Sequence, residues 1–187
     1  MIVGIDEVGR GCWAGPLVAG AVLLRRPVAG VRDSKKLTRA QREELDVVIR
    51  AKAPAYGLGW VSVEELDVVG LTQAVRLAME RALACIVEPY QRIIIDGNYN
   101  FLAHMPHTQA TIAADDIVPA VSAASIIAKV ARDRFMAQTA AQFPAYGFER
   151  HVGYGTPGHI AALKLHGICD LHRRSFKPIQ AALGAAI

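Results

Sequence analysis

The stretch GIDEVGRGCWAGP, from Gly4 to Pro16, ends a short apolar strand in two adjacent carboxylates, Asp6 and Glu7. Neighbouring residues on an extended strand point to opposite faces, so these carboxylates converge only if the strand ends or bulges at Glu7. Gly9 follows two residues later and permits such a break. A second apolar run, Leu17 to Leu24, comes directly after the Gly/Pro turn. The stretch therefore predicts two neighbouring strands with a polar site where the first one ends.

The rest of the chain alternates further strand patterns with helical ones. Short apolar or alternating runs bounded by turn residues predict strands at 1–5, 17–24, 56–63, 93–95 and 108–116. Apolar residues at helical spacing predict helices from Thr38, over 71–87, and from Pro119 to about Gln142. Thr38 is a suitable N-cap, and Pro119 is tolerated in a first helical turn. The pattern predicts an α/β fold with a mixed five-stranded sheet flanked by helices.

Length and composition predict one globular domain. Of the 187 residues, 52% are hydrophobic and 20% are charged, and the mean hydropathy is +0.25. A chain of this length buries roughly 70% of the surface that it exposes when unfolded. The sequence contains no internal repeat, low-complexity tract or long linker. We expect a single domain over residues 1–187, with a helical C-terminal part over roughly 140–187.

Charge and cysteine usage narrow the class of protein. The formal net charge is +4 and the isoelectric point about 9.1, which suits a polyanionic partner without establishing one. Cys12, Cys85 and Cys169 are far apart and form no C-x-x-C, so neither a disulfide framework nor a thiolate metal site is indicated. Charged residues interrupt any N-terminal signal sequence, and the longest apolar stretch near the start is too short and broken to span a bilayer. We expect a cytoplasmic protein with free thiols.

Acidic residues recur where the predicted strands end. Asp6-Glu7, Asp96 and Asp115-Asp116 each follow such a strand. Taken singly, each has an ordinary explanation, because Asp-Gly is a common turn and acids favour helix N-termini. Neighbouring strands can bring these ends together, and carboxylates gathered there repel one another unless a divalent cation binds. An all-oxygen donor set suits Mg²⁺ or Mn²⁺ rather than zinc. In a basic protein, such a cluster indicates metal-assisted phosphodiester hydrolysis.

Five sequence blocks occur in an order typical of one family. They are DEVGRG at 6–11, DSKKLT at 33–38, IDGN at 95–98, VSAASIIAKVARD at 121–133, and YGFERHVGYGTPGH…HRRSF from 146 to 176. Together they resemble bacterial ribonuclease HII, of the type 2 ribonuclease H family, over nearly the whole chain. The resemblance implies an RNase H-like fold and endonucleolytic cleavage of the RNA strand in RNA–DNA hybrids. It also implies cleavage 5′ to single ribonucleotides embedded in duplex DNA, leaving a 3′-OH and a 5′-phosphate.

The resemblance assigns four catalytic, metal-binding carboxylates. They fall on Asp6, Glu7, Asp96 and one of the Asp115-Asp116 pair. In the family the last acid stands seven residues before the first serine of the S-A-A-S block, and counting back from Ser122 gives Asp115. We therefore predict Asp115 rather than Asp116 as the fourth carboxylate.

The resemblance also assigns the substrate-binding residues, which are Gly9, Arg10, Gly11, Ser34, Lys35, Ser125, Lys129 and Tyr154. In the family the Gly-Arg-Gly loop brings its backbone to the ribose 2′-OH, Tyr154 packs on the same nucleotide, and the other residues lie near the nucleic-acid backbone. Glycine suits a close backbone approach, and the 2′-OH both donates and accepts hydrogen bonds. Ser125 and Lys129 share one helix face by their spacing, a pattern that also fits an ordinary solvated face.

Several alternatives follow from the same residues. The acidic pattern also fits ribonuclease HIII or a junction resolvase, although the arginine between the glycines and the lack of a substantial N-terminal extension favour HII. A non-catalytic hybrid-binding module would be expected to lack at least one of the four carboxylates. The G-x-G-x-x-A pattern at 9–14 resembles a dinucleotide-binding loop, but Gly15-Pro16 and a strand follow where a helix is needed.

Partners and the remaining polar residues complete the expectations. We expect a monomer that binds RNA–DNA hybrids and DNA containing single ribonucleotides, without a membrane association. The tail KPIQAALGAAI, from 177 to 187, favours a helix and lacks the paired aromatics of a sliding-clamp peptide. Arg173 and Arg174 fit either an ion-pair site or a phosphate clamp. His104 and His107 form an isolated H-x-x-H that is insufficient to indicate zinc.

Overall fold

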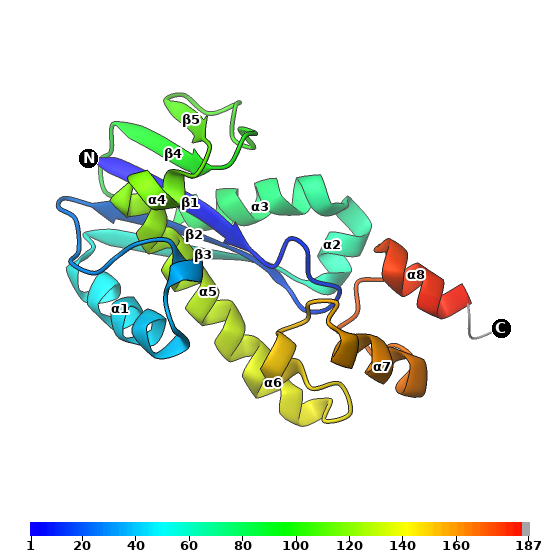
Figure 1. Cartoon of the computed structure of the whole chain (residues 1–187). Helices are drawn as coiled ribbons and strands as arrows, with labels where there is room; N and C mark the ends of the chain where they lie inside the picture. Colours follow the sequence, from blue (N-terminus) through cyan, green and yellow to red (C-terminus); the bar gives the residue numbers. More distant parts are fainter. Residues whose placement is uncertain (185–187) are drawn as a thin grey trace.

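A computed structural model describes residues 1–184 and contains a five-stranded mixed sheet with helices on both faces (Figure 1). The strands are β1 (Ile2–Val8), β2 (Leu17–Leu24), β3 (Ala55–Val61), β4 (Arg92–Asp96) and β5 (Thr108–Thr111). Their order in the sheet is β3-β2-β1-β4-β5. The β1–β2 and β2–β3 pairs are antiparallel, whereas β4 runs parallel to both β1 and β5. The predicted fold class is confirmed.

Helices follow the strands and dominate the C-terminal part. They are α1 (Arg39–Lys52), α2 (Val63–Val69), α3 (Leu71–Ala84), α4 (Ala114–Ile117), α5 (Pro119–Thr139), α6 (Phe148–His151), α7 (Pro157–His166) and α8 (Lys177–Gly184), with short 3-10 helices η1 (Ser34–Lys36) and η2 (Ala140–Gln142). Thr38 caps α1 as predicted, because its side chain accepts the Gln41 amide while Gln41 accepts the Thr38 amide. None of the described helices is long and apolar enough to cross a membrane.

The two faces of the sheet are covered by α5 and α3 (Figure 1). A Cβ at Gly4 of β1 would lie 2.1 Å from the carbonyl carbon of Ala120, so the missing side chain lets α5 rest directly on the strand. On the opposite face, Val3 and Ile5 are fully buried with the apolar residues of α3. Because side chains alternate along a strand, Asp6 shares the α5 face with Gly4, and Glu7 shares the α3 face with Ile5.

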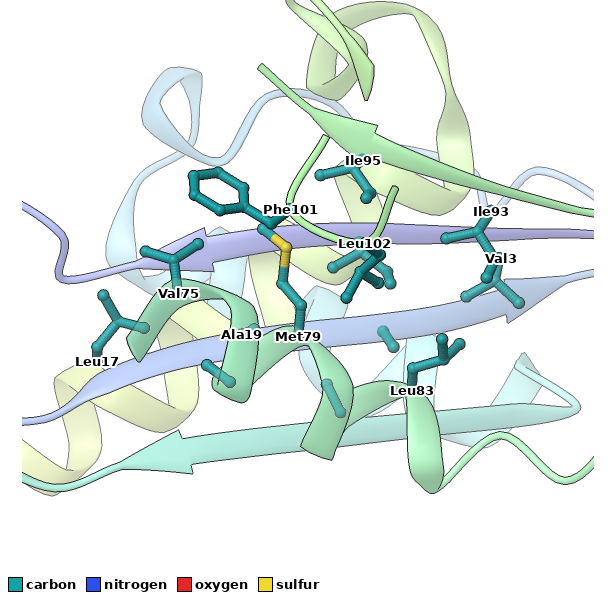
Figure 2. Close-up of a cluster of buried hydrophobic side chains, with 14 of the residues drawn as sticks. Val3, Leu17, Ala19, Val75, Met79, Leu83, Ile93, Ile95, Phe101 and Leu102 are labelled. Carbon is teal, nitrogen blue, oxygen red and sulfur yellow. The ribbon is translucent and has the colours of Figure 1, made fainter. Parts of the chain in front are cut away.

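The main apolar core lies between the sheet and α3 (Figure 2). Figure 2 shows Met79 of α3 extending toward the strand residue Ile95, beside Phe101 and Leu102 from the β4–β5 connection. Met79, Val3, Ile95 and Leu102 are fully buried. This packing holds β1 and β4 rigidly side by side and fixes the positions of their C-terminal ends.

The segment after the Gly-Arg-Gly loop joins the sheet to the C-terminal helices. The Trp13 amide donates to the Gly153 carbonyl at 2.8 Å, and the Arg173 amide donates to the Trp13 carbonyl at 2.8 Å. Ala14 forms an isolated antiparallel bridge with His172. The C-terminal part is therefore attached through the same stretch of chain that carries the predicted recognition loop.

The structure corrects three predicted boundaries. The first strand does not stop at residue 5 but runs through Asp6 and Glu7 to Val8, so no bulge brings these carboxylates together. The third strand ends at Val61, and Ser62 caps the unpredicted helix α2. The fifth strand ends at Thr111 rather than at residue 116, because Ala113 takes a left-handed conformation with φ 53° and α4 begins.

Candidate active site

Asp6 is the buried carboxylate at the centre of the sheet. Asp6 is 8% exposed, and its Oδ1 accepts a hydrogen bond from the Glu7 amide at 2.8 Å. Burial, with the neighbouring Glu7 charge as the second cause, raises the pKa of Asp6 to about 8. A carboxyl group in this environment is held mainly in its neutral form until a cation offsets the cost of ionisation.

Asp96 ends β4, the parallel neighbour of β1. Its Oδ1 accepts the Ala114 amide at 2.8 Å and the Asp115 amide at 3.4 Å, and these bonds fix the first turn of α4 beside the strand. This position of α4 leaves Asp115 buried, with 5% of its surface exposed. Carboxylate oxygens of Asp6, Asp96 and Asp115 all lie within 4.8 Å of one another. Three of the predicted carboxylates thus form one cluster.

Glu7 and Asp116 lie outside this cluster. The Glu7 side chain lines the same cleft from the other face of β1, and its Oε1 lies 3.5 Å from Arg10 Nη1. Burial raises the pKa of Glu7, with the Asp96 charge also acting in that direction. Asp116 is exposed and pairs with Lys36. The geometry favours Asp115 over Asp116 and leaves Glu7 as a carboxylate at the side of the cluster.

The cluster fits a hard divalent cation. Its donors are all carboxylate oxygens, which Mg²⁺ and Mn²⁺ accept, and it contains no thiolate or imidazole. Burial raises the pKa of Asp115, and the Asp96 charge adds to that effect. An exposed cation is paired with the cluster: Lys35 Nζ lies 3.6 Å from Asp115 Oδ2. The repulsion is consequently left for a bound metal to relieve.

A cleft of about 380 Å³ is lined by Asp6, Glu7 and Asp96. All eight predicted substrate-binding residues line it: Gly9, Arg10, Gly11, Ser34, Lys35, Ser125, Lys129 and Tyr154. A larger hollow of about 600 Å³ beside α7 and α8 is mainly apolar and has no carboxylate in its lining. Three of the predicted metal-binding carboxylates, Asp6, Glu7 and Asp96, line the smaller cleft, so we place the candidate active site there.

The Gly-Arg-Gly loop forms one wall of the cleft. Gly9 has φ +90°, which favours glycine, whereas a Cβ at Gly11 would have no neighbour within 4 Å. The Arg10 side chain is 55% exposed and its guanidinium carbon lies 5.5 Å from the Phe101 ring centroid. On the opposite side, Lys129 Nζ lies 5.8 Å from the Tyr154 ring centroid. The backbone at Gly11 is open to a ligand.

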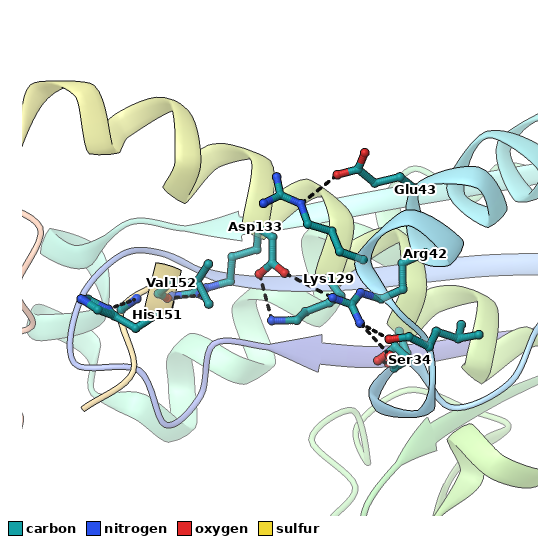
Figure 3. Close-up of polar contacts among 12 residues, drawn as sticks. Ser34, Arg42, Glu43, Lys129, Asp133, His151 and Val152 are labelled. Atoms are coloured by element: carbon teal, nitrogen blue, oxygen red, sulfur yellow. Dashed lines mark hydrogen bonds and ion pairs between the residues drawn. The ribbon is translucent and has the colours of Figure 1, made fainter. Parts of the chain in front are cut away.

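Arg42 also lines the cleft, and the sequence pattern did not identify it. Its Nη1 donates to the carbonyls of Ser34 at 3.1 Å and Leu37 at 2.6 Å, so it supports η1 from beneath. Figure 3 shows Arg42 and Lys129 approaching Asp133 from two sides. Arg42 Nη2 lies 3.9 Å from Asp133 Oδ2, and Lys129 Nζ lies 2.9 Å from Asp133 Oδ1. The helical spacing of Lys129 and Asp133 was visible in the sequence, but Arg42 comes from another helix and carries no local signal.

Arg173 and Arg174 have different environments. Arg173 is fully buried and donates to the carbonyls of Gly15 at 2.9 Å and Arg10 at 3.3 Å, so it fits neither the ion-pair site nor the phosphate clamp expected from the sequence. Arg174 is exposed, and its backbone amide donates to Asp67 Oδ2 at 2.8 Å. Both residues hold chain segments together.

Two buried histidines lie behind Tyr154. His159 Nδ1 lies 2.9 Å from the Tyr154 carbonyl, and its Nε2 lies 3.0 Å from His172 Nε2. Burial is the main cause that lowers the pKa of His159 and lowers the pKa of His172 to about 4. These histidines are therefore neutral packing residues that support the wall carrying Tyr154.

Comparison with known proteins defines the class of this fold and site. The family model for Ribonuclease HII matches residues 3–179. The chain therefore belongs to the ribonuclease HII family, and the resemblance seen in its sequence is confirmed. It is a ribonuclease H, a metal-dependent endonuclease acting on RNA–DNA hybrids, so the non-catalytic alternative is wrong.

Individual relatives agree with this membership. Ribonuclease HII from Acidovorax sp. strain JS42 is 48% identical over 100% of this chain and 90% of its own length. The crystal structure of ribonuclease H2 from Pyrococcus horikoshii OT3 superposes with a TM-score of 0.84 at 27% identity, covering 98% of this chain and 97% of that one. RNase HII from Archaeoglobus fulgidus, solved in a complex with PCNA, gives a TM-score of 0.80 at 28% identity, with 97% and 96% coverage.

Proposed function

We propose that the enzyme cuts duplex DNA on the 5′ side of a single embedded ribonucleotide, as well as the RNA strand of hybrids, leaving a 3′-OH and a 5′-phosphate. The observation that carries this proposal is the shared cleft, in which the open backbone at Gly11 and the buried carboxylate of Asp6 face one space. A single 2′-OH bound at the loop would place the adjacent phosphate over the carboxylates.

We assign the catalytic, metal-binding role to Asp6, Glu7, Asp96 and Asp115, with Mg²⁺ or Mn²⁺ as the cofactor. When bound, such a cation activates water and stabilises negative charge on the phosphate oxygens. The chain's own contribution is to hold oxygens of three carboxylates within 4.8 Å of one another, with Asp6 and Asp115 buried and Asp96 partly exposed. Glu7, on the other face of β1, bounds the cluster where the Arg10 guanidinium also lies.

Recognition of the ribonucleotide falls to Gly9, Arg10, Gly11 and Tyr154. Backbone groups of the loop can hydrogen-bond the 2′-OH, and a deoxyribose would leave them unpaired, which discriminates more strongly than shape. Tyr154 is 40% exposed, and its ring supplies a surface on which the same sugar can pack. Discrimination thus depends on the separation between this loop and Tyr154.

Phosphate contacts fall to Ser34, Lys35, Ser125 and Lys129. Lys35 is exposed beside the carboxylates, and the hydroxyls of Ser34 and Ser125 lie 2.9 Å apart on the same wall of the cleft. One strand of a duplex can follow this wall. Charge contacts of this kind position a duplex without reading its sequence. Binding is accordingly expected to weaken as salt concentration rises.

The wider properties are proposals of the same kind. We propose one catalytic domain over residues 1–187, whose helical part over roughly 140–187 binds substrate, acting as a cytoplasmic monomer. The helix α8 begins at Lys177, as the tail sequence predicted, and residues 185–187 lie outside the described residues. The tail's lack of paired aromatics gives no ground for proposing a clamp partner.

The test is cleavage of an end-labelled DNA duplex carrying one ribonucleotide, with Mg²⁺, with Mn²⁺ and with EDTA. An all-DNA duplex of the same sequence is the control. A single metal-dependent cut immediately 5′ to the ribonucleotide is the expected result. Cutting of the RNA–DNA hybrid but not of the single-ribonucleotide duplex would refute the finer proposal while leaving the ribonuclease H activity intact.

A further inference from the structure

Arg132 of α5 is fully buried directly behind the cleft. Its guanidinium donates to three backbone carbonyls: Nε to Pro16 at 2.8 Å, Nη2 to Ala14 at 3.0 Å, and Nη1 to Val152 at 2.8 Å. Ala14 and Pro16 follow the Gly-Arg-Gly loop, whereas Val152 precedes Tyr154 by two residues. One side chain therefore connects the two walls to which ribonucleotide recognition is assigned.

Glycines from both walls close around this guanidinium. Gly9, Gly15 and Gly153 have φ values of +90°, +85° and +89°. A Cβ at Gly9 would lie 2.3 Å from Arg132 Nε, and Cβ atoms at Gly15 and Gly153 would lie 3.3 and 3.4 Å from its Nη2. The backbone at Gly9 thus lies directly against Arg132, and Gly15 and Gly153 lie beside its Nη2, so the guanidinium is enclosed by backbone from both walls.

Stability alone is a poor reason for this arrangement. Among residues 1–184, neither Arg132 nor the fully buried Arg173 forms an ion pair with a carboxylate. Burial, with the charge of Arg132 as the second cause, lowers the pKa of Arg173 to about 10, so its position in the fold disfavours the charged form of Arg173. Buried charges are often replaced by apolar residues without loss of stability. A planar fork with five donors, however, can hold several separate carbonyls at fixed distances.

The same helix carries the phosphate-binding face. Ser125, Lys129 and Arg132 lie at successive turns of α5, and the first two line the cleft. Because the helix is rigid, Arg132 fixes the positions of both recognition walls relative to Ser125 and Lys129, and also relative to Asp6. Because Arg132 is fully buried, it can help to align the reacting phosphate through the two walls but cannot contact the phosphate itself.

We infer that Arg132 is a positioning residue that fixes the Gly9–Gly11 loop relative to Tyr154 and thereby determines selection of the ribonucleotide. This inference rests on the proposed function, because it concerns the same cleft. The residue is not assigned any contact with substrate. Its loss is expected to affect the rate at which bound substrate is cut, and to affect duplex affinity little.

The first experiment compares Arg132→Lys with wild type and with Arg134→Lys. The control changes an arginine on the same helix that is 46% exposed and pairs with Asp46 of α1, away from the cleft. Single-turnover cleavage of the one-ribonucleotide duplex should fall roughly 10- to 100-fold in Arg132→Lys, since small misplacements from remote changes cost this much. Duplex affinity should change less than about twofold, because the phosphate contacts remain. Arg134→Lys should behave as wild type.

A double-mutant cycle with Tyr154→Ala separates positioning from a merely structural role. If Arg132 acts through the Tyr154 wall, the rate loss caused by Tyr154→Ala should be much smaller in the Arg132→Lys background than in wild type. Multiplicative losses would overturn the inference, as would an Arg132→Lys variant that cuts at the wild-type rate. Wild type that fails to cut this duplex would instead reject the proposed function.

A second variant covers the case in which Arg132→Lys does not fold. A Cβ at Gly153 would lie 2.2 Å from the Ala14 carbonyl oxygen, so Gly153→Ala forces the two walls apart and keeps the guanidinium. We expect the same signature: slower single-turnover cleavage, unchanged duplex affinity, and a diminished effect of Tyr154→Ala. Gly153→Ala protein that is folded and cuts at the wild-type rate would show that the wall spacing does not matter.

Discussion

The hydroxyl of Ser34 lies 2.9 Å from the hydroxyl of Ser125, although 91 residues separate them in the chain. This buried contact ties η1 to α5 at the cleft. It also brings Lys35, the next residue of η1, to within 3.6 Å of Asp115. This hydroxyl pair and the bonds from Arg42 thus help to hold η1 beside the carboxylates.

Removing one hydroxyl should therefore loosen this wall of the cleft. Ser125→Ala is expected to lower the cleavage rate roughly tenfold and the free energy of unfolding by about 1 kcal/mol, the usual contribution of one hydrogen bond. Steady-state cleavage and urea unfolding measure the two effects. Thr139→Ala, which deletes a hydroxyl bonded to the Phe135 carbonyl on the same helix, is the control and should leave cleavage unchanged. Equal effects of the two variants on cleavage would contradict the assignment.

The neighbours Asp115 and Asp116 offer a matched pair. Asp115 is buried in the cluster, whereas Asp116 is exposed beside Lys36. Asp115→Asn should lower metal-dependent cleavage roughly 100-fold or more, because it removes a group that stabilises the transition-state charge. Asp116→Asn should change cleavage less than about threefold, as expected for an exposed pair. The reverse order of effects would assign the fourth carboxylate to Asp116.

Asp6 should make the metal-free protein less stable. Its buried carboxyl group faces two other acids, and the cost of ionising it there is offset when a cation binds. In EDTA at pH 8, Asp6→Asn should raise the free energy of unfolding by at least about 1 kcal/mol, since one pKa unit corresponds to 1.36 kcal/mol. Cleavage should be abolished. Urea unfolding in EDTA and in excess Mg²⁺ measures the effect.

The advantage of Asp6→Asn should shrink or reverse in excess Mg²⁺, because metal binding stabilises only the wild-type site strongly. Asp116→Asn is the control and should show no such dependence on the metal. An Asp6→Asn variant that is less stable than wild type in EDTA would mean that the carboxylates are not under repulsive strain.

The sequence predicted the sheet and the identity of the clustered acids better than their placement. Apolar runs such as Ile93–Ile95 predicted the strands. The expectation that neighbouring strands bring their acidic ends together holds for Asp6 and Asp96, because β1 and β4 pair in parallel. Asp115, however, reaches the cluster from a helix. The left-handed turn at Ala113 that starts this helix has no signal in the sequence, because alanine rarely takes that conformation.

Long-range roles were the least predictable. A helical arginine such as Arg132 normally extends to solvent, and only the folded chain shows the carbonyls that it binds. The helix α2 was missed because Val61-Ser62-Val63 continues the alternation of the preceding strand. Its capping pair, Ser62 with Glu65, was the available local signal.

The histidine pair behind Tyr154 predicts an acid-sensitive fold. The folded-state pKa of His172 is lowered from 6.5 to about 4, so the unfolded chain takes up a proton in this interval and the folded chain does not. The free energy of unfolding should therefore fall as pH drops from 6.5 to 4, by up to about 1.4 kcal/mol per pH unit for this one group. The loss should be complete once pH has passed the folded-state pKa. Urea midpoints at several pH values between 7.5 and 4.5 measure the slope.

The comparison that isolates this effect is His172→Asn against His107→Asn. Asparagine at 172 can still accept the Cys169 amide that His172 Nδ1 accepts at 2.9 Å, but it cannot be protonated. His107 is exposed and has φ 60°, a conformation that asparagine tolerates. His172→Asn should flatten the pH slope between 6.5 and 4, whatever its stability at pH 7.5, and His107→Asn should keep the wild-type slope. A slope unchanged by His172→Asn would show that His172 is not the buried neutral group that carries the acid sensitivity.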